Sequence, residues 1–377
     1  MELGSEFDLD LSQLADTSDT IFTYLEDFQA IYTDSGRNAL RLLSGILQGE
    51  AILLPDYICG TVADALPEDC RIIYYPINRQ LQINMEKLEE LLQAKSVRFL
   101  YLMHYFGALQ QKDGIAHIAY LKQKYHLTII EDTTHSLFTA KKTIGDYIIA
   151  SLRKWFPIPD GGVLYAEKGR PFPGQPQEKK PASQKVEAML LKKLYLTEGF
   201  DCNAKYREIF AKEEAAFQNQ TGVYQMSDIA HFLLSHFSIA SMCYSRRRNA
   251  ALLLEGLRGM QCIVEGSGMQ CISEGYNVQC RSEALQHGYD IAVNLKPAEV
   301  PLSLPIYAAK RDMLRNLLIK RKVYCAVHWP LGHPAAYEDS RWIGEHILSL
   351  PLDQRYQKED MEYLLDCLVA SKKEMES

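Results

Sequence analysis

Two charged residues stand at the ends of neighbouring apolar runs in the middle of the chain. Asp132 ends the run at residues 129–132, and Lys154 lies just beyond the run at 147–151. A lysine amine can form a Schiff base with an aldehyde, and a carboxylate can keep a pyridine nitrogen protonated. Lysine and aspartate at adjacent strand ends are therefore what pyridoxal phosphate (PLP) chemistry requires.

Each of these residues also has an ordinary structural interpretation. A lysine where a strand meets a loop is usually a surface residue, and Asp132 can cap the next helix. His135 can be a hydrogen-bonded core histidine, but three residues after Asp132 it can equally reach a cofactor ring. The functional interpretation is better supported for the three residues together than for each alone, because their order along the chain agrees with one mechanism.

The neighbours of Lys154 fit the same chemistry. Ser151, three residues earlier, can donate a hydrogen bond to a phosphate oxygen. Trp155 and Phe156 follow the lysine directly, and we expect them to desolvate its amine.

A second stretch that can bind a phosphate lies at residues 33–46. Thr33, Asp34 or Ser35 can cap a helix there, and Gly36 lets the backbone approach a ligand. The free N–H groups at a helix start favour an anion. Taken alone, this stretch is more simply an ordinary capped helix.

The pattern between residues 50 and 168 predicts the element that positions these groups. Short apolar runs alternate with amphipathic helical patterns, which is typical of an α/β fold with a mostly parallel sheet wrapped by helices. Ligands bind at the carboxyl ends of the strands in such sheets. The predicted strands lie at 51–55, 71–76, 97–104, 127–132, 147–151 and 162–168.

The rest of the chain suggests four parts. We expect a helical arm at 1–30, a large cofactor-binding domain at 31–187, a helical connection at 188–259 and a small C-terminal α/β domain at 260–377. The stretch 167–187 is rich in Pro, Gly and Lys, and is either an active-site flap or a plain linker.

A tandem repeat at 260–280 spaces three cysteines nine residues apart, at Cys262, Cys271 and Cys280. A duplicated loop or hairpin is the favoured interpretation, because a metal site would have only His287 nearby as a fourth ligand, at no recognisable zinc spacing. We therefore predict no metal.

Composition narrows the class of protein. The 377 residues carry 41 basic and 48 acidic side chains, a net charge of −7, which argues against a nucleic-acid binder. The run Arg246–Arg247–Arg248 is then expected to be a solvated helix face. The sequence has no apolar run long enough to predict a membrane span, and its N-terminus does not have the features of a signal peptide. None of the nine cysteines stands in a C-x-x-C pair. These features predict a cytoplasmic protein with reduced thiols.

Several segments together resemble one family. They occur in the order, and at about the spacing, of the DegT/DnrJ/StrS sugar aminotransferases, from about residue 30 to the end: SGRNAL, LLPDY, MHYFG, IIEDTTHS, SLRKWFPIPDGG, YQMSDI, CAVHWP and ILSLPL. The resemblance implies the fold of type I PLP enzymes, PLP as cofactor, and a homodimer with shared active sites. It implies transfer of an amino group from a donor such as glutamate to a keto group, typically on a nucleotide-linked sugar.

The resemblance also assigns residues. It makes Lys154 the Schiff-base lysine, Asp132 the partner of the pyridine nitrogen, and His135 a neighbour of the ring. Two sets of residues complete the site: Gly36, Arg37, Asn38 and Ser151 at the phosphate, and His328 and Tyr224 near the substrate.

Three departures from the family pattern concern this site. The chain has Ser151-Leu152-Arg153-Lys154 where the family has the longer S-F-H-x-x-K, so Arg153 can supply charge at the phosphate. Residues 222–226 have no Asn where the family's G-Y-N-x-R-M segment reaches the neighbouring subunit's phosphate. The family's ring-stacking aromatic falls on Cys59, for which Tyr57 can substitute. Two alternatives therefore stay open: a PLP enzyme acting on a non-sugar substrate, and a non-catalytic PLP-binding relative.

Overall fold

The structure is a computed structural model that describes residues 2–264, 289–330 and 336–376. The cysteine repeat continues beyond the helix that ends at Val264, and the side chains of its cysteines and of His287 lie outside the described residues.

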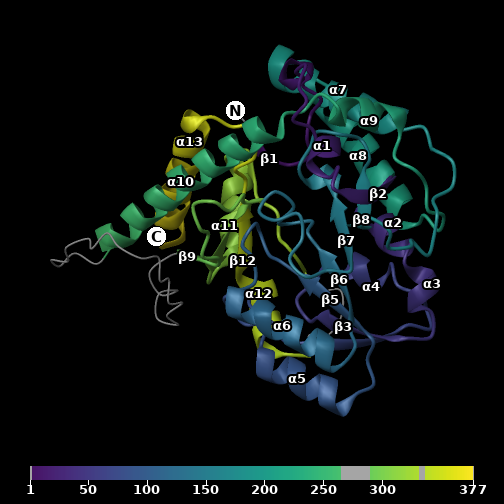
Figure 1. Ribbon diagram of the computed structural model, residues 1–377. Coiled ribbons are helices and arrows are strands. Elements are labelled where there is room, and N and C mark those ends of the chain that lie inside the picture. Colours follow the sequence, from purple (N-terminus) through teal and green to yellow (C-terminus); the bar gives the residue numbers. More distant parts are fainter. Residues whose placement is uncertain (1, 265–288, 331–335, 377) are drawn as a thin grey trace.

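The centre of the molecule is a seven-stranded sheet (Figure 1). Strands β3 to β7 run parallel, β8 is antiparallel to β7, and β2 is antiparallel to β8. This confirms the predicted mostly parallel sheet, with every predicted strand present. The order across the sheet is β2 (Phe28–Thr33), β8 (Gly162–Glu167), β7 (Tyr147–Ser151), β6 (Thr128–Asp132), β5 (Phe99–Met103), β3 (Ala51–Pro55) and β4 (Arg71–Tyr75).

The inner strands are buried on both faces, which explains why their sequences are continuously apolar rather than alternating. All five residues of β3 and all five of β5 are buried. Helices α5 (Met85–Ala94) and α6 (Lys112–Lys124) lie between these strands in the sequence, and each buries leucine or isoleucine on one side. The sheet therefore holds the ends of β6 and β7 on a rigid frame.

The N-terminal arm differs from the predicted helical arm. It contains only the short α1 (Ile21–Tyr24), a 3₁₀ turn at Leu11–Gln13, and two strands. One is β2, and the other is β1 (Leu3–Gly4), which pairs with β11 (Val323–Tyr324). The arm thus joins distant parts of the chain through backbone pairing, which a local apolar pattern does not reveal.

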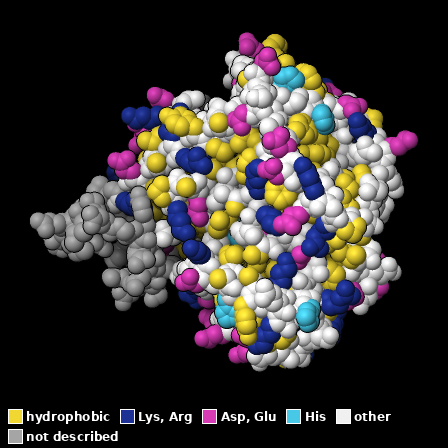
Figure 2. All heavy atoms as spheres, viewed as in Figure 1, with side chains coloured by type: hydrophobic (Ala, Val, Ile, Leu, Met, Phe, Trp, Pro, Cys, Tyr) yellow, Lys and Arg dark blue, Asp and Glu magenta, His cyan; other side chains and the backbone are white. Residues whose placement is uncertain are grey.

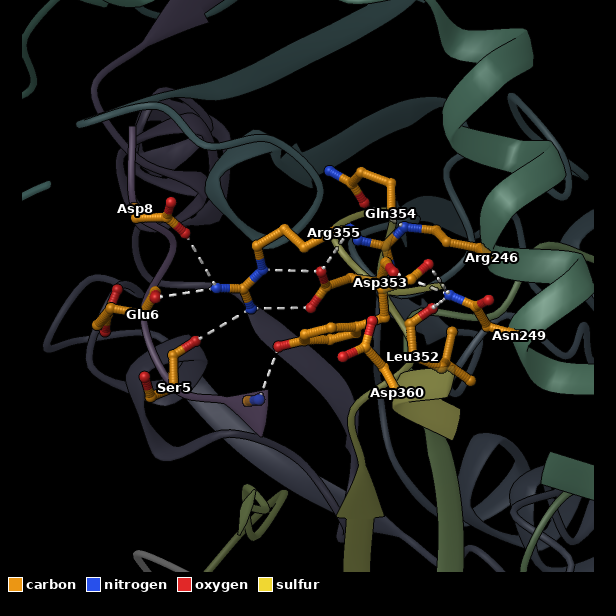
Figure 3. A network of polar contacts seen from close by, with 12 residues as sticks. Ser5, Glu6, Asp8, Arg246, Asn249, Leu352, Asp353, Gln354, Arg355 and Asp360 are labelled. Atoms are coloured by element: carbon orange, nitrogen blue, oxygen red, sulfur yellow. Dashed lines mark hydrogen bonds and ion pairs between the residues drawn. The ribbon is translucent and has the colours of Figure 1, made fainter. Parts of the chain in front are cut away.

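Figure 3 shows the polar network that fixes this arm. Arg355 binds both carboxylate oxygens of Asp353, at 2.8 and 2.9 Å, and also the backbone oxygen of Glu6 at 3.2 Å. Burial alone would raise the pKa of Asp353, but the charge and hydrogen bonds of Arg355 hold it below its usual value. Gln354 in turn donates to the backbone oxygen of Trp155 at 2.7 Å, so the network reaches the residue next to Lys154.

Helices follow the loop after β8. They are α7 (Ser183–Glu198), α8 (Asn203–Gln218), α9 (Asp228–Leu234) and α10 (Ile239–Val264). The interpretation of Arg246–Arg248 as a solvated face is wrong for Arg246, which is fully buried and donates to the backbone oxygen of Leu302 at 2.8 Å. Its guanidinium also lies over the ring of Trp155.

The C-terminal part forms a second, smaller sheet beside the first (Figure 1). It has the antiparallel order β12 (Ile347–Leu350), β10 (Leu304–Ala308) and β9 (Tyr289–Ile291). Helices α11 (Arg311–Lys320), α12 (Glu338–His346) and α13 (Lys358–Glu376) accompany it, and α13 packs against α10. Helix α10 belongs mostly to the predicted helical connection at 188–259, and α13 belongs to the predicted C-terminal domain at 260–377, so their packing joins these two parts.

Acidic and basic side chains are interspersed with hydrophobic ones on the face shown in Figure 2. None of the helices within the described ranges combines the length and the hydropathy needed to cross a membrane.

Candidate active site

A cavity of about 190 Å³ lies at the carboxyl ends of β6 and β7, against the start of α2 (Gly36–Arg41). The two strands are neighbours, with Asp132 in register with Ile149, so their ends meet at one edge of the sheet. Most of the predicted site residues line this cavity: Gly36, Arg37, Cys59, Asp132, His135, Ser151, Arg153 and Lys154.

Asp132 forms the acidic part of the cavity. Tyr101 donates to its Oδ2 at 2.7 Å, and the Thr134 backbone N–H donates to its Oδ1 at 2.8 Å. Burial raises the pKa of Asp132, although these two hydrogen bonds oppose the shift. A cation placed beside this carboxylate would be stabilised strongly, because the site is removed from water.

Thr134 connects the aspartate strand to the lysine segment. Its hydroxyl oxygen accepts from the Ser151 N–H at 3.1 Å, and its backbone oxygen accepts from the Trp155 indole N–H at 2.8 Å. Together with its own bond to Asp132, these contacts fix the spacing between the two predicted catalytic elements.

Lys154 lies in the short 3₁₀ turn Leu152–Lys154 that follows β7. The expected desolvation by its neighbours is wrong. Trp155 and Phe156 are buried in a core cluster, whereas Lys154 is exposed at the cavity. The 3₁₀ turn explains this result, since the residues after the lysine turn back into the protein rather than over the amine.

Two arginines form the basic part of the cavity. The Nε groups of Arg37 and Arg153 are both buried and find no hydrogen-bond partner among the described residues. Gly36 lets the backbone come close here, because a Cβ at this position would lie 2.9 Å from the Cβ of Ser151. A buried N–H group without a partner is costly, and an anion bound in the cavity could accept from both Nε groups.

His135 lies on the side of the cavity that faces the small sheet. Its Nδ1 accepts from the Phe106 N–H at 3.4 Å, and its ring stacks on Trp329 with 5.1 Å between centroids. Burial, with the charges of His328 and Lys154, lowers the pKa of His135 well below its usual value. The imidazole is therefore neutral at physiological pH.

Four predicted residues do not line the cavity. Asn38 instead donates to Asp34 at 2.6 Å and to the Gly222 oxygen at 3.2 Å, so its amide ties α2 to the segment after α8. Tyr224 places its ring under the Lys180 amine, 3.6 Å from the centroid.

The other two, Tyr57 and His328, lie behind the cavity wall. Tyr57 packs against Tyr105 and Trp329, and it is Trp329 that lines the cavity. His328 touches the rings of His135 and Trp329 and bonds Ser349 at 2.8 Å. Burial and the charge of Lys154 lower the pKa of His328 to about 3.

Among the lining residues that sequence reasoning missed are Tyr101, Thr134, Glu214, Phe217 and Trp329. Thr134 stands directly between Asp132 and His135, and Trp329 directly after His328, so proximity in sequence could have suggested both. Glu214 and Phe217 come from α8, and no local pattern connects that helix to the site.

In the described ranges, no group of three or more His, Cys, Asp or Glu side chains is placed to hold a metal ion.

No family model matches the sequence, and no curated protein matches it either. Solved structures match over nearly the whole chain. A DegT/DnrJ/EryC1/StrS aminotransferase from Brucella abortus aligns with a TM-score of 0.60 and 15% identity, covering 93% of this chain and 87% of its own. The chain has the fold of these aminotransferases.

Two further structures agree with this fold. NtdA from Bacillus subtilis with bound cofactor PMP has a TM-score of 0.62 and 18% identity, covering 94% of this chain and 75% of its own. The putative sugar aminotransferase Spr1654 from Streptococcus pneumoniae, in its PLP form, has a TM-score of 0.62 and 11% identity, covering 99% of both chains. These likenesses support the predicted type I fold of PLP enzymes.

Proposed function

We propose that the protein is a PLP-dependent aminotransferase. The observation that carries the proposal is that one cavity brings together a buried carboxylate at Asp132, a free amine at Lys154, and two arginines, Arg37 and Arg153, whose buried Nε groups have no hydrogen-bond partner among the described residues. A ring with a basic nitrogen, an aldehyde and a phosphate needs these three kinds of partner.

The side chains fit such a group. Asp132 is held by Tyr101 and Thr134 and would keep the ring nitrogen protonated. Ser151, Arg153 and Arg37 would hold the phosphate, because the serine hydroxyl and the unpartnered Nε groups of the two arginines are donors that suit an anion. When bound, PLP supplies an electron sink for the pair of electrons released when a proton leaves the α-carbon of the amino donor.

Lys154 has two tasks in this proposal. Its amine would bind the cofactor covalently at rest and, once released by the amino donor, would move the proton between carbon atoms. Neutral His135 would line the same space, and its Nδ1 already accepts from the Phe106 N–H, which leaves Nε2 as the donor.

The acceptor is proposed to be a keto group on a nucleotide-linked sugar. Support comes from the solved structures of similar fold, among them DesI with its TDP-sugar product, with 13% identity and a TM-score of 0.58. A homodimer is part of the proposal. Lys154 is exposed within one chain, and a second copy would cover it and exclude water from the reaction.

The six cysteines that the structure describes are free thiols, which supports a reducing compartment such as the cytoplasm.

Trapping the covalent lysine adduct tests the proposal. Purified protein is incubated with PLP, reduced with borohydride and digested, and the modified peptide is identified by mass spectrometry. We expect the label on Lys154, its loss in Lys154→Ala, and its retention in the control Lys168→Ala, which changes an exposed lysine outside the cavity. Protein that takes no label at Lys154 contradicts the proposal.

A second measurement separates the reaction types. Glutamate and other amino acids are added singly to the PLP-loaded protein, and the conversion of the cofactor to its amine form is followed by absorbance. Conversion by at least one amino acid supports transamination, and a keto-sugar nucleotide should then regenerate the aldehyde. No conversion by any amino acid would favour a different PLP reaction or a binding role.

A further inference from the structure

The C-terminal half of α8 covers the basic part of the cavity. Glu214 and Phe217 both line it, beside Arg37 and Arg153. The helix, Asn203–Gln218, follows β8 in the sequence, so it adds side chains that belong to neither the aspartate strand nor the lysine turn.

Arg153 is held loosely by this helix. Its Nη1 lies 3.5 Å from Glu214 Oε2, its guanidinium lies 4.6 Å from the centre of the Phe217 ring, and its Nε has no hydrogen-bond partner in the part of the chain that the structure describes. The Glu214 side chain is 43% exposed. Long, half-exposed ion pairs of this kind are weak.

The backbone of α8 is held by other residues. Arg37 donates to the Phe217 oxygen at 2.9 Å, and Arg41 donates to the oxygen of Gln220, two residues beyond the end of the helix, at 2.6 Å. Positive charges at the C-terminal end of a helix satisfy its free carbonyl groups and are favoured by its dipole. The Glu214 side chain can therefore leave Arg153 while the helix end remains in place.

We propose that Glu214 is a positioning residue that holds Arg153 in the ligand-free protein and is displaced by the phosphate of the ligand. The inference rests on the proposed function, because it concerns the phosphate of the same cofactor. A phosphate forms stronger, two-pronged bonds with a guanidinium than a loosely placed carboxylate does. The two anions repel each other at one arginine, so Glu214 lowers the affinity for the phosphate.

The variant Glu214→Gln tests this role, because it removes the charge and keeps the shape. Binding of PLP and, separately, of inorganic phosphate is measured by equilibrium titration with wild-type protein and the variant. Glu208→Gln is the matched control, since it removes an exposed charge from the same helix outside the cavity. We expect Glu214→Gln to bind both ligands about fivefold more tightly, the factor that corresponds to a weak ion pair, and Glu208→Gln to match wild type.

The outcomes separate this inference from the proposed function. Unchanged or weaker binding by Glu214→Gln overturns the inference, because a purely structural role of Glu214 would misplace Arg153 when the charge is removed. If wild-type protein forms no adduct at Lys154 but the variant still binds phosphate more tightly, the proposed function fails and Glu214 keeps its role at an anion site. If an adduct forms at Lys154 but Glu214→Gln binds both ligands as wild type does, the proposed function stands and the inference about Glu214 fails.

Discussion

Asp160 offers a test of how burial controls stability beside the site. Its carboxyl is only 5% exposed, and its Oδ1 accepts from the Ser227 N–H at 3.0 Å. Burial raises the pKa of Asp160 from 3.8 to about 6, with a contribution from the nearby charge of Asp34 and opposition from the Ser227 bonds. We expect Asp160→Asn to stabilise the protein at neutral pH.

The magnitude and sign follow from the pKa shift. The folded protein binds the proton more tightly than the unfolded chain, so the contribution of Asp160 to the free energy of unfolding falls as pH rises from about 4 to about 6. A shift from 3.8 to about 6 corresponds to a loss of about 3 kcal/mol. Asparagine still accepts from the Ser227 N–H and carries no charge, so the variant avoids this loss.

Urea denaturation of cofactor-free protein at several pH values measures the effect. Wild type and Asp160→Asn should have similar unfolding free energies near about pH 4 and differ by about 3 kcal/mol, in favour of the variant, above about pH 7. Asp69→Asn, in an exposed loop, is the control and should change stability equally little at all pH values. If Asp160→Asn is no more stable than wild type above about pH 7, burial of the ionised Asp160 carboxylate does not destabilise the folded protein, and the reasoning is refuted.

Three other substitutions test the frame around the site. Asp353→Asn should lower the free energy of unfolding by about 3 kcal/mol in urea, because it removes the charge that binds the mostly buried Arg355 and leaves only the longer ion pair with Asp8 at 3.7 Å; the control Asp339→Asn, in a more exposed pair, should cost less than about 1 kcal/mol. Gly36→Ala should cost about 1–3 kcal/mol by thermal or urea unfolding, because its Cβ would meet Ser151 at 2.9 Å. Trp329→Leu should weaken PLP binding, followed by absorbance, by roughly two- to tenfold through loss of ring stacking with His135; unchanged affinity would show that this wall does not contact the ligand.

The sheet could be predicted because its signal is local. Runs such as 51–55 and 99–103 are continuously apolar and are bounded by polar turns, as expected for strands buried on both faces. Strand β2 escaped prediction because five of its six residues are only half-buried. Its position is decided by pairing with β8, about 130 residues further along the chain, and no local pattern carries that information.

Burial of charge was the least predictable property. Arg246 looks like its neighbour Arg247 in the sequence, yet only Arg246 is fully buried, because distant backbone oxygens and the Trp155 ring meet it. Lys154 shows the reverse, since apolar neighbours suggested burial and the turn exposed it. In both cases the direction of the side chain depends on tertiary contacts rather than on neighbouring residue types.

The site itself could be found from the sequence only to the extent that its residues end consecutive strands. Asp132 and Ser151 satisfied that condition, and the sheet placed them at one edge. Glu214 did not, because the fold holds α8 at the cavity through the Arg37 contact with the Phe217 carbonyl and the Arg41 contact with the Gln220 carbonyl just beyond the helix.

Thr134 holds the two predictable parts of the site together, and Thr134→Val measures how much that connection contributes. Valine has nearly the same shape but lacks the hydroxyl, so the Ser151 N–H loses its acceptor while the backbone bonds to Asp132 and Trp155 remain. An unsatisfied, part-buried N–H costs about 1–3 kcal/mol, and we expect the free energy of unfolding to fall by this amount.

The same substitution should also weaken PLP binding, because Ser151 is one of the proposed phosphate donors and its backbone would no longer be fixed. Thr134→Ser is the control, since serine keeps the oxygen that accepts from Ser151 and should retain near wild-type affinity. If Thr134→Val loses stability but binds PLP as wild type does, the hydroxyl serves the fold alone, and the phosphate end does not depend on the connection to the aspartate strand. If affinity falls further than stability, the connection positions the ligand as well as the strands.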